Sequence, residues 1–437
     1  MSHVVEQYLL HLISAGIWVG AGLGGYVFVF NRWLLRMRDS SLKIPVMESV
    51  AAFFFLAPAV LGWLTPASWL LIPCAAYLLL AVDQARLIVL RKQMSGERPN
   101  HVQALEPAAT TRRSRLLTTT DLHLVRYQIN LLAPELACDA ALTVAHLSDF
   151  HVNDQLPMSY YTGVFEQALA EAPDLVLLTG DYLTYERHLP LLETALAPLK
   201  GHPHAYAILG NHDYWVGAGM IRPVLEKAGL QLLIGQKYGE YRIAEYPAWQ
   251  ASPGGTGSSE ASSARRAPVV RLFGSEKPWG RGCKISYDPA SVLDIILTHT
   301  PDNIYQFLDG DQGRRAVFCG HLHAGQVCLP GNPPLSIFLP SNYGRRFDRR
   351  QGFDGHFVVN RRRSRSLAPG QVASEGAPVH MFVSGGVGTG KPAIRVCCPP
   401  DFFLVRFNFV GARRPCDQSG LLDQRLLQVQ PSIEVPS

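Results

Sequence analysis

The stretch Ala205-Tyr-Ala-Ile-Leu-Gly-Asn-His-Asp213 joins a short apolar run to a cluster of polar side chains. Its apolar half, Ala205–Leu209, has the length and composition of a buried strand. Its polar half places a carboxamide, an imidazole and a carboxylate directly behind that strand. Because functional sites commonly lie where the strands of a buried sheet end, this stretch predicts an α/β domain with its chemistry at the strand ends.

Four further apolar runs end in the same way. Each predicts a strand that leads into residue types able to bind metals. These strands are Ala141–Leu147, Asp174–Leu178, Leu293–Leu297 and Arg315–Cys319. The residues that follow the four strands are, in order, Asp149 and His151, Asp181, His299, and His321 and His323.

Helical stretches alternate with these strands, which predicts a buried sheet covered by helices. They are Gly163–Glu171, Leu189–Leu199, Met220–Ala228 and Asp302–Leu308. Each polar motif alone is weak evidence, because Asp-x-His and Gly-Asp occur often by chance and a histidine behind a strand is more often structural than a ligand. Five such elements in one order make coincidence the poorer explanation.

In this order the five motifs resemble those of the calcineurin-like metallophosphoesterase superfamily, from Leu142 to about Phe409. Three further elements resemble its bacterial membrane-anchored branch, which includes UDP-2,3-diacylglucosamine pyrophosphatases of lipid A biosynthesis and related phosphodiesterases. They are Gly-His-Leu-His-Ala-Gly-Gln, Tyr-Gly-Arg-Arg-Phe and Val-Ser-Gly-Gly-Val-Gly-Thr. The resemblance implies a sandwich of two mixed sheets flanked by helices, and a hydrolase of phosphoester or pyrophosphate bonds.

The family pattern also implies a role for each motif residue. It assigns Asp149, His151 and His323 to one divalent metal ion, Asn211, His299 and His321 to a second, and Asp181 to the bridge between the two. The residue types agree with this assignment, because carboxylate, carboxamide and imidazole ligands suit Mn²⁺, Fe or Zn²⁺ better than Mg²⁺. Two such ions would activate a water that attacks phosphorus, with no covalent enzyme intermediate.

Four more residues are candidates for catalysis or binding. His212 could donate a proton to the phosphate or to the leaving oxygen, and Asp213 could either orient His212 or cap a helix. Arg345 and Arg346 could bind a second phosphate or a headgroup, or belong to a solvated basic loop.

The segment Gly385–Lys391 imitates a nucleotide-binding P-loop. Pro392 stands where a Ser or Thr should bind Mg²⁺, and it would hinder the helix that should begin there. We therefore reject an ATPase and expect a strand, His380–Ser384, that leads into a glycine turn.

Two uncharged stretches precede the catalytic region. The first, Gln7 to Phe30, is long enough for a membrane-spanning helix. The second, Ser49 to Val82, would measure about 50 Å as one straight helix, more than the roughly 30 Å of a bilayer core. Pro66 favours a break between Leu64 and Ser68 and therefore two short spans, with a single tilted or broken helix as the alternative.

Basic residues near these stretches predict the orientation. They are Arg32, Arg36, Arg38 and Lys43 after the first stretch, and Arg86, Arg91, Lys92 and Arg98 after the second. With three spans both basic clusters lie on the cytoplasmic side, whereas with two spans one cluster must cross the membrane. We therefore expect a multi-pass protein of the cell inner membrane, in contact with membrane lipids, with its catalytic domain in the cytoplasm. A buried helical hairpin is the alternative, but such helices rarely lack charge on every face.

These patterns divide the chain into four parts. They are a membrane anchor of two or three helices (residues 1–92), a basic linker (93–116), the catalytic domain (117–410), with surface insertions near 251–267 and 361–377, and a tail (411–437). The net charge of +5 arises mainly from local arginine clusters, so no nucleic-acid partner is expected. Eight cysteines without a Cys-x-x-Cys pair favour reduced thiols over disulfides.

The combined prediction is a two-metal hydrolase that acts on a phosphorylated, lipid-linked substrate such as UDP-2,3-diacylglucosamine. One alternative in the same class is a phosphodiesterase or phosphatase that acts on another phospholipid, a nucleotide or a phosphoprotein. An alternative of another class is a non-catalytic membrane protein that senses phosphate or serves as a scaffold.

Overall fold

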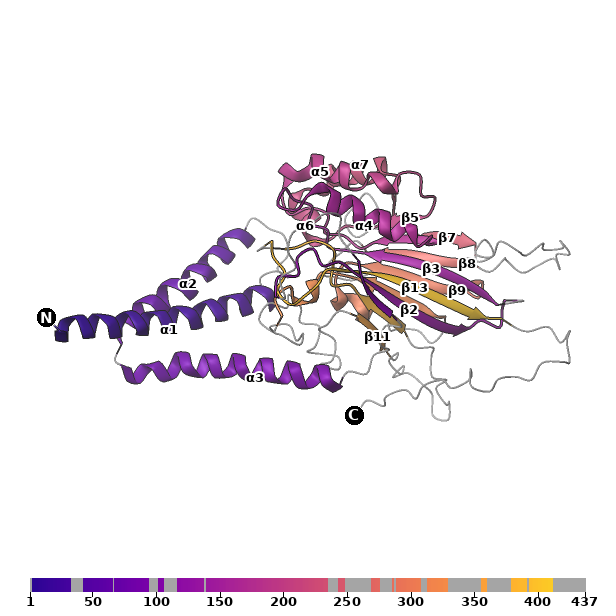
Figure 1. Ribbon diagram of the computed structural model, residues 1–437. Coiled ribbons are helices and arrows are strands. Elements are labelled where there is room, and N and C mark those ends of the chain that lie inside the picture. Colours follow the sequence, from indigo (N-terminus) through magenta and orange to yellow (C-terminus); the bar gives the residue numbers. More distant parts are fainter. Residues whose placement is uncertain are drawn as a thin grey trace, which may run out of the picture.

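Two parts of the chain stand apart in the computed structural model: a group of long helices and a domain of two stacked sheets (Figure 1). The structure describes residues 2–32, 42–65, 67–93, 101–105, 116–136, 139–234, 243–247, 269–275, 285–286, 288–307, 313–328, 355–359, 379–390 and 393–411. The predicted insertions near 251–267 and 361–377 lie outside the described residues, as do Arg345, Arg346 and residues 412–437 of the predicted tail.

The first sheet has seven strands in the order β1-β2-β13-β3-β4-β5-β6. The strands are β1 (His101–Ala104), β2 (His123–Leu132), β3 (Ala140–Leu147), β4 (Leu175–Leu178), β5 (Ala205–Ala207), β6 (Gln231–Leu232) and β13 (Asp401–Val410). β3 to β6 are parallel to one another, whereas β2 and β13 are parallel to each other and antiparallel to β3. β2 and β13 therefore end at the edge opposite to the one where β3, β4 and β5 end.

The second sheet has six strands in the order β11-β12-β10-β9-β8-β7. They are β7 (Ile243–Pro247), β8 (Val269–Ser275), β9 (Ser291–Thr298), β10 (Arg315–Cys319), β11 (Gly355–Val359) and β12 (Val379–Val383). The four central strands are parallel, and the two edge strands are antiparallel to their neighbours. Both sheets are therefore mixed.

Aromatic contacts join the two sheets into one core. Tyr127 of β2 meets Phe382 of β12 at 5.6 Å between ring centroids, and His146 of β3 meets Phe318 of β10 at 5.1 Å. All four side chains are buried, and the parallel strands are apolar on both faces, as expected for sheets covered on both sides.

Helices cover the outer face of the first sheet (Figure 1). They are α4 (Met158–Ala170), α5 (Leu189–Ala195), α6 (Asn211–Val216) and α7 (Ala218–Lys227). Short 3₁₀ turns complete the domain: η3 (Glu186–His188), η4 (Ala197–Leu199), η5 (Pro301–Gln306) and η6 (His323–Gly325). Tyr161 and Phe165 of α4 and Ile221 of α7 lie in the same hydrophobic core as the strands. The predicted sandwich of two mixed sheets flanked by helices is therefore confirmed.

The predicted strands are confirmed, with ends that differ by at most two residues. The predicted helices differ more. Helix α4 begins at Met158 rather than Gly163, directly after the extended Pro157, and the stretch Leu189–Leu199 divides into α5 and η4. The stretch predicted as Asp302–Leu308 is the 3₁₀ turn η5, which starts at Pro301, where the ring already fixes a helical φ.

One finding changes the predicted domain boundary. Strand β1 lies inside the range 93–116 that was predicted to be a linker, yet it is paired antiparallel with β2. The first sheet therefore begins before residue 117. The hydrogen bonds of an edge strand depend on its neighbour rather than on its own apolar content, so a short polar strand leaves little trace in the sequence.

The long helices are α1 (Ser2–Arg32), α2 (Lys43–Leu64) and α3 (Leu71–Gln93), with the 3₁₀ turn η2 (Ala67–Leu70) before α3. The predicted break between Leu64 and Ser68 is confirmed, because α2 ends at Leu64. Helices α1 and α2 approach closely where Gly22 faces the carbonyl of Phe54, since a side chain there would collide with it.

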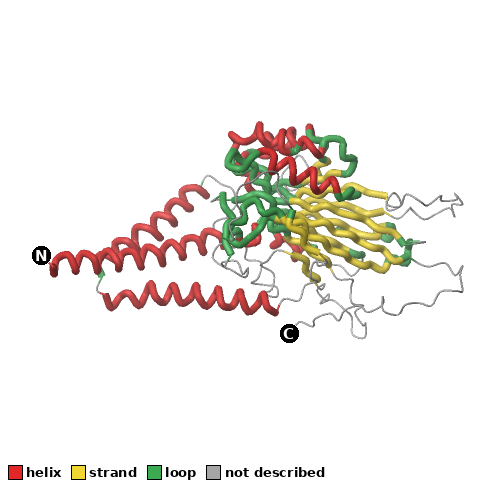
Figure 2. Tube along the Cα trace, viewed as in Figure 1, coloured by secondary structure: helices red, strands yellow, loops and turns green. Residues whose placement is uncertain are grey.

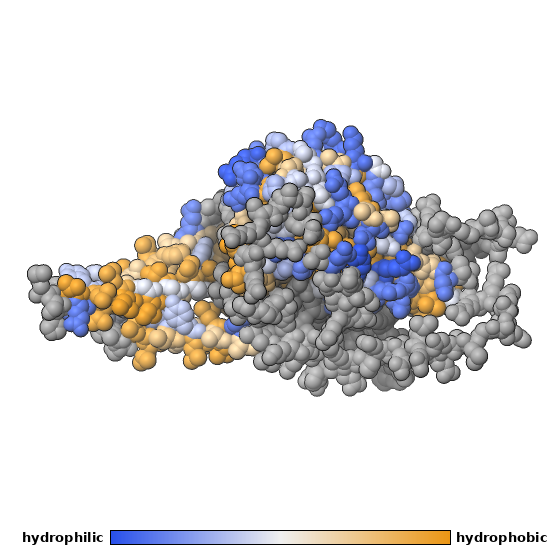
Figure 3. All heavy atoms as spheres, viewed as in Figure 1, coloured by the Kyte–Doolittle hydropathy of each residue, from blue (hydrophilic) through white to orange (hydrophobic). Residues whose placement is uncertain are grey.

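Two segments, Val5–Phe30 and Pro45–Leu64, are long and apolar enough to cross a membrane by length and composition. Only 22% and 6% of their respective apolar windows are buried, so their apolar side chains mostly face outward (Figure 3). A buried core helix would show the opposite. The apolar part of α3, Leu71–Ala85, is shorter. These helices are compatible with membrane anchoring.

Candidate metal centre

The predicted ligands lie just after strands, at one edge of the two sheets. Asp149 and His151 follow β3, Asp181 follows β4, Asn211 follows β5, His299 follows β9, and His321 and His323 follow β10. Figure 2 shows most loops of the domain at the end that faces the long helices, with fewer at the opposite end. The parallel direction of β3, β4 and β5 brings the first four residues to that edge, and the parallel pair β9 and β10 brings the other three.

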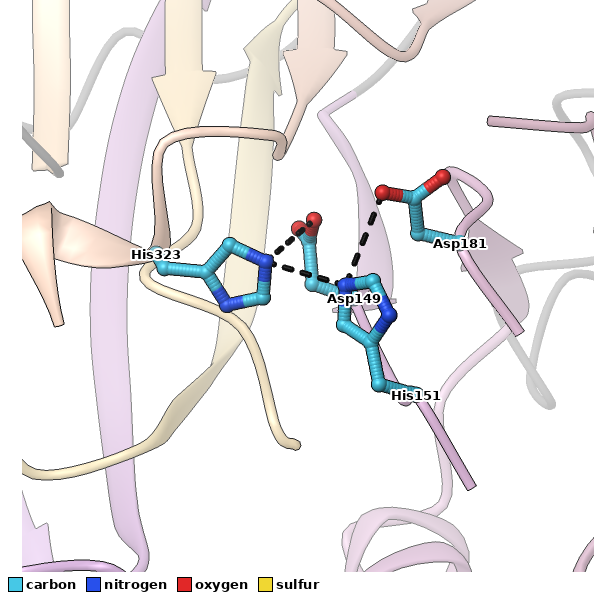
Figure 4. Close-up of side chains that lie close together, drawn as sticks. All are labelled: Asp149, His151, Asp181 and His323. Carbon is cyan, nitrogen blue, oxygen red and sulfur yellow. Dashed lines mark hydrogen bonds and ion pairs between the residues drawn. The ribbon is translucent and has the colours of Figure 1, made fainter. Parts of the chain in front are cut away.

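A first group of side chains consists of Asp149, His151, Asp181 and His323 (Figure 4). The Nε2 atoms of His151 and His323 lie 3.0 Å apart. The Oδ1 atom of Asp149 lies 3.4 Å from His323 Nε2, and the Oδ2 atom of Asp181 lies 3.5 Å from His151 Nε2. One ligand atom from each residue lies within 4.8 Å of the others, a spacing that one cation can bridge.

A second group consists of Asp181, His299 and His321, and it shares Asp181 with the first. The Nε2 atom of His299 lies 3.2 Å from Asp181 Oδ2 and 3.3 Å from His321 Nδ1. The Oδ1 atom of Asn211 lies 3.1 Å from the same His299 atom. The structure therefore gathers all seven predicted ligands into two adjoining groups joined by one carboxylate.

Hydrogen bonds behind the groups orient two of the imidazoles. Nδ1 of His299 lies 2.8 Å from the carbonyl oxygen of Thr179, so this nitrogen carries the proton and donates it to the carbonyl. The Nε2 atom of His299 then faces into the group. Nδ1 of His151 lies 2.8 Å from Oγ1 of Thr184 and leaves Nε2 facing inward in the same way. Such supporting contacts are typical of histidines that bind metals, so the donor set fits a pair of divalent cations.

The backbone at the ligands is unusual. Nine non-glycine residues of the described chain have positive φ, and five of them are candidate ligands: Asp149, His151, Asp181, His321 and His323. A non-glycine residue in this region costs about 1 kcal/mol or more and persists only where the surrounding structure enforces it. Such strain is typical of functional sites, because it directs a side chain where an ordinary strand end would not.

Two glycines allow main chain to pass directly against the carboxylates. A side chain at Gly210 would collide with Oδ1 of Asp181, and one at Gly320 would collide with Oδ2 of Asp149. The main-chain N–H groups of nearby residues donate to the same carboxylates, from His212 to Asp181 (2.9 Å) and from His321 to Asp149 (2.9 Å). The carboxylates are thus fixed by the loops of other motifs.

Burial and neighbouring charges give the histidines of the two groups different pKa values. Burial lowers the pKa of His151 to about 3, an effect that His212 reinforces, and it lowers the pKa of His323 well below its usual value. Burial opposes the charged form of His299 as well, yet the carboxylates of Asp181 and Asp149 raise its pKa to about 9. Before a metal ion binds, the imidazoles of the first group are therefore neutral near pH 7, whereas His299 is protonated beside the Asp181 carboxylate.

The two predicted catalytic residues have different surroundings. The ring of His212 is partly exposed and lies 4.7 Å from the ring of His151, at the mouth of the site. Asp213 is fully buried, and its carboxylate accepts main-chain hydrogen bonds from Gly210, Asp181 and Tyr182, each 2.8 Å long. These bonds support the helix-capping alternative for Asp213, since it closes the start of α6 and also holds the loop that carries Asp181.

Behind the first group lies a buried arginine that the sequence did not assign to this place. The guanidinium of Arg395 is fully buried and donates to the carbonyl oxygens of Gly385, Gly386 and Gly388 at 2.7–2.9 Å. It also reaches the carbonyl of His323 at 3.4 Å. Arg395 therefore fixes the glycine turn against the metal-ligand loop, and its guanidinium does not face the mouth of the site.

The glycine turn is not a phosphate cradle. Its main-chain N–H groups donate to protein acceptors: Gly385 to Asp401, Gly386 to Ser384, Val387 to Ser148, Gly388 to Asp149, and Gly390 to Gln326. A P-loop instead directs such groups at phosphate oxygens. The structure thus agrees with the rejection of an ATPase.

Comparison with known proteins identifies the domain. A sequence profile of the calcineurin-like phosphoesterase family matches residues 142–325. Phosphodiesterase YaeI of Escherichia coli is 26% identical over 44% of this chain and 64% of its own length. A metallophosphoesterase of Aquifex aeolicus is 24% identical over 62% of this chain and 86% of its own length.

A third relative is the UDP-2,3-diacylglucosamine pyrophosphatase LpxG of Chlamydia muridarum, which is 24% identical over 43% of this chain and 65% of its own length. The chain thus spans less than two thirds of the length of the Escherichia coli and Chlamydia relatives. The matched segment contains every predicted metal ligand, from Asp149 to His323. The chain therefore contains a calcineurin-like metallophosphoesterase domain, whose profile matches residues 142–325.

Proposed function

We propose that this chain hydrolyses a phosphoester or pyrophosphate bond in a lipid-linked substrate, for which UDP-2,3-diacylglucosamine is the leading candidate. The observation that carries the hydrolase proposal is the shared carboxylate. Asp181 approaches His151 of the first group and His299 of the second through the same Oδ2 atom, at 3.5 and 3.2 Å. A carboxylate oxygen that faces both groups would allow Asp181 to hold both cations.

Each group would hold one ion of Mn²⁺, Fe or Zn²⁺. Asp149, His151 and His323 would bind the first, Asn211, His299 and His321 the second, and Asp181 both. When bound, two such ions acidify a water and neutralise charge on the phosphoryl oxygens. The protein supplies rigid placement, since its strained loops and main-chain hydrogen bonds hold the ligands before substrate arrives.

We assign the remaining roles, in proton transfer, positioning and substrate binding, to residues that are not metal ligands. His212 would donate a proton to the leaving oxygen, because its ring is partly exposed beside His151. Asp213 would act as a positioning residue for Asp181 rather than in proton transfer. Arg345 and Arg346 would bind a second phosphate or a headgroup.

The lipid part of the proposal rests on the apolar helices and on the pyrophosphatase relative. Helices α1 and α2 would anchor the chain in the cell inner membrane as part of a multi-pass segment, and the basic clusters after the apolar stretches would keep the catalytic domain in the cytoplasm. An anchored enzyme gains effective concentration on substrates in the same bilayer. The phosphodiesterase relative supports a second candidate, a phosphodiester of another phospholipid or nucleotide.

The test is hydrolysis by the detergent-purified full chain of UDP-2,3-diacylglucosamine beside bis(p-nitrophenyl) phosphate. Each substrate is measured with Mn²⁺ and with EDTA, for wild type and Asp181→Asn. We expect Mn²⁺-dependent cleavage of both substrates by wild type and none by the variant. Cleavage of the model diester alone would overturn the lipid-linked substrate. If neither substrate is cleaved although the protein binds Mn²⁺ and phosphate, the scaffold alternative would replace the enzyme.

A further inference from the structure

Large apolar side chains that are exposed on the described part of the two-sheet domain gather at two places. At the site end they are Leu116, Leu117, Tyr185, Trp215 and Ile394, and at the opposite end they are Leu132 and Val410. Single exposed apolar residues are normal on any protein. Their distribution is informative, because five of the seven lie on segments that contact the metal-ligand loops or pair with a segment that does.

Two of the five lie on one side of the ligands. The ring of Trp215 packs on the ring of His212 at 4.5 Å between centroids, and 42% of Trp215 is exposed. Tyr185 follows Thr184, whose hydroxyl contacts His151. These two aromatic side chains therefore flank the mouth of the site on the side of α6 and η3.

The other three lie on the side of the glycine turn. Ile394 precedes Arg395, which reaches the carbonyl of His323. Leu117 is bridged to Val396, and the carbonyl of Leu116 accepts the N–H of the residue after Val396 at 2.7 Å. Leu116, Leu117 and Ile394 are therefore neighbours, and each is about half exposed.

We call these five residues the apolar rim. The rim lies on segments next to the ligand loops, whereas Leu132 and Val410 are the last residues of β2 and β13, which end at the opposite edge of the sheet. Figure 2 shows that the long helices lie toward the end of the domain where most loops gather. In the sequence, Arg112-Arg113-Ser114-Arg115 directly precedes Leu116. Basic residues next to apolar ones, together with Trp and Tyr, form the composition that proteins place at a membrane interface.

We propose that the apolar rim enters the headgroup layer of the bilayer and holds the metal centre at the membrane surface. This inference deepens the proposed function and rests on its membrane anchor. The long helices alone limit only the distance of the domain from the bilayer. The apolar rim would determine which face of the domain lies against the membrane. A phosphate attached to a lipid would then reach the metal ligands without leaving the membrane, which gives the site a high effective substrate concentration.

The first test compares two sets of substitutions in the full chain, reconstituted into vesicles of phosphatidylethanolamine and phosphatidylglycerol. The rim variant is Leu116→Ser, Leu117→Ser and Ile394→Ser, and the matched control is Leu132→Ser and Val410→Ser. We expect the rim variant to cleave vesicle-borne UDP-2,3-diacylglucosamine about tenfold more slowly, with unchanged kcat/KM for bis(p-nitrophenyl) phosphate. The control should match wild type on both substrates. Equal rates of the rim variant and the control on the vesicle substrate would overturn the inference.

A second measurement needs no catalysis. Wild-type protein is reconstituted with a phosphatidylcholine that carries a photoactivatable diazirine in its acyl chain, and the adducts are located by mass spectrometry. We expect adducts in peptides that contain residues 116–117, 185, 215 and 394, and none at Leu132 or Val410. Adducts restricted to the long helices, or cross-links from the rim to a second copy of the chain, would overturn the inference. If rim adducts form but the lipid substrate is not cleaved, the proposed substrate fails while the rim stands.

Discussion

The two groups of candidate ligands are supported by different parts of the fold. In the second group, the imidazole of His299 is fully buried and bonded to the carbonyl of Thr179, within the loop that follows β4. In the first group, the side chain of His323 is 13% exposed, and its loop is held from behind by Arg395. Protonation differs as well, with a raised pKa at His299 and lowered pKa values at His151 and His323. Strand ends thus carry the ligands of both groups, and the first group is held in addition by a buried cation from a distant segment.

The largest expected effect comes from the residue that both groups share. Asp181→Asn should reduce hydrolysis at least about a thousandfold and weaken metal binding at both groups, because a carboxamide supplies less charge to bridge two cations. Metal content by inductively coupled plasma mass spectrometry, beside hydrolysis rates, measures both. The control is Asp154→Asn, an exposed carboxylate in the loop after β3 that is not among the ligands. Retained binding at both groups in Asp181→Asn would refute the bridge.

Removing one imidazole from each group in turn should show whether the two groups bind their metal ions independently. His323→Ala should lose the ion of the first group and keep the other, and His299→Ala should do the reverse. His299→Ala should in addition destabilise the protein by about 1–3 kcal/mol, because the carbonyl of Thr179 loses its buried donor. Metal titrations followed by electron paramagnetic resonance of Mn²⁺, and urea unfolding, measure the two effects. Loss of both ions from either variant would show that the groups bind as one unit.

Arg395 should matter to the first group more than to the second. Arg395→Met leaves the carbonyls of Gly385, Gly386 and Gly388 without their donor, which should cost about 3 kcal/mol of stability. We expect the metal affinity of the first group to fall about tenfold, with partial rescue by Arg395→Lys, whose ammonium replaces only some of the hydrogen bonds.

The matched control for Arg395 is Arg406→Met, since Arg406 is exposed on β13. Isothermal titration calorimetry with Mn²⁺ measures the affinity, and urea unfolding measures the stability. An equal loss of affinity at both groups would mean that Arg395 acts only on global stability.

The effect that we expect to be smallest is a pH dependence of stability and of metal affinity that arises from His299 of the second group. In chelator-treated protein the folded pKa of His299, about 9, lies above its ordinary value of 6.5. Its contribution to stability should therefore be complete below pH 6.5 and disappear as the pH rises through 9. Since a cation must displace this proton, metal affinity at the second group should rise over the same interval. The number of protons released on Mn²⁺ binding, measured by calorimetry in buffers of different ionisation enthalpy, should fall as the pH rises through 9.

Local patterns were enough to find the strands that carry the ligands. Apolar runs that end in Asp, Asn or His mark β3, β4, β5, β9 and β10. They did not single out β2 and β13, although both pair in the middle of the first sheet. In β2 the alternation of Tyr127, Ile129 and Leu131 with polar residues is a strand signal that could have found it. The parallel pairing of β2 with β13 could not be found, because the strands lie far apart in the sequence and no local pattern encodes a partner.

The supporting residues were the harder part of the site. Thr179 and Thr184 contact ligand histidines, yet a threonine in a loop has no signal of its own. Nothing in the sequence around Arg395 indicates that the fold turns its guanidinium inward toward carbonyl groups. A buried arginine is costly unless its donors are satisfied, and only the assembled glycine turn satisfies them.

Ligand chemistry and strand burial are local properties, so the order of residues was enough to indicate which side chains can bind metals and that each follows an apolar strand. Which ligands meet depends on the assembled fold. His151 and His323 are 172 positions apart, and their Nε2 atoms come within 3.0 Å because the two sheets stack with their loop-bearing edges aligned. The positive φ at five ligands is also set by that assembly, since an isolated loop would relax from it.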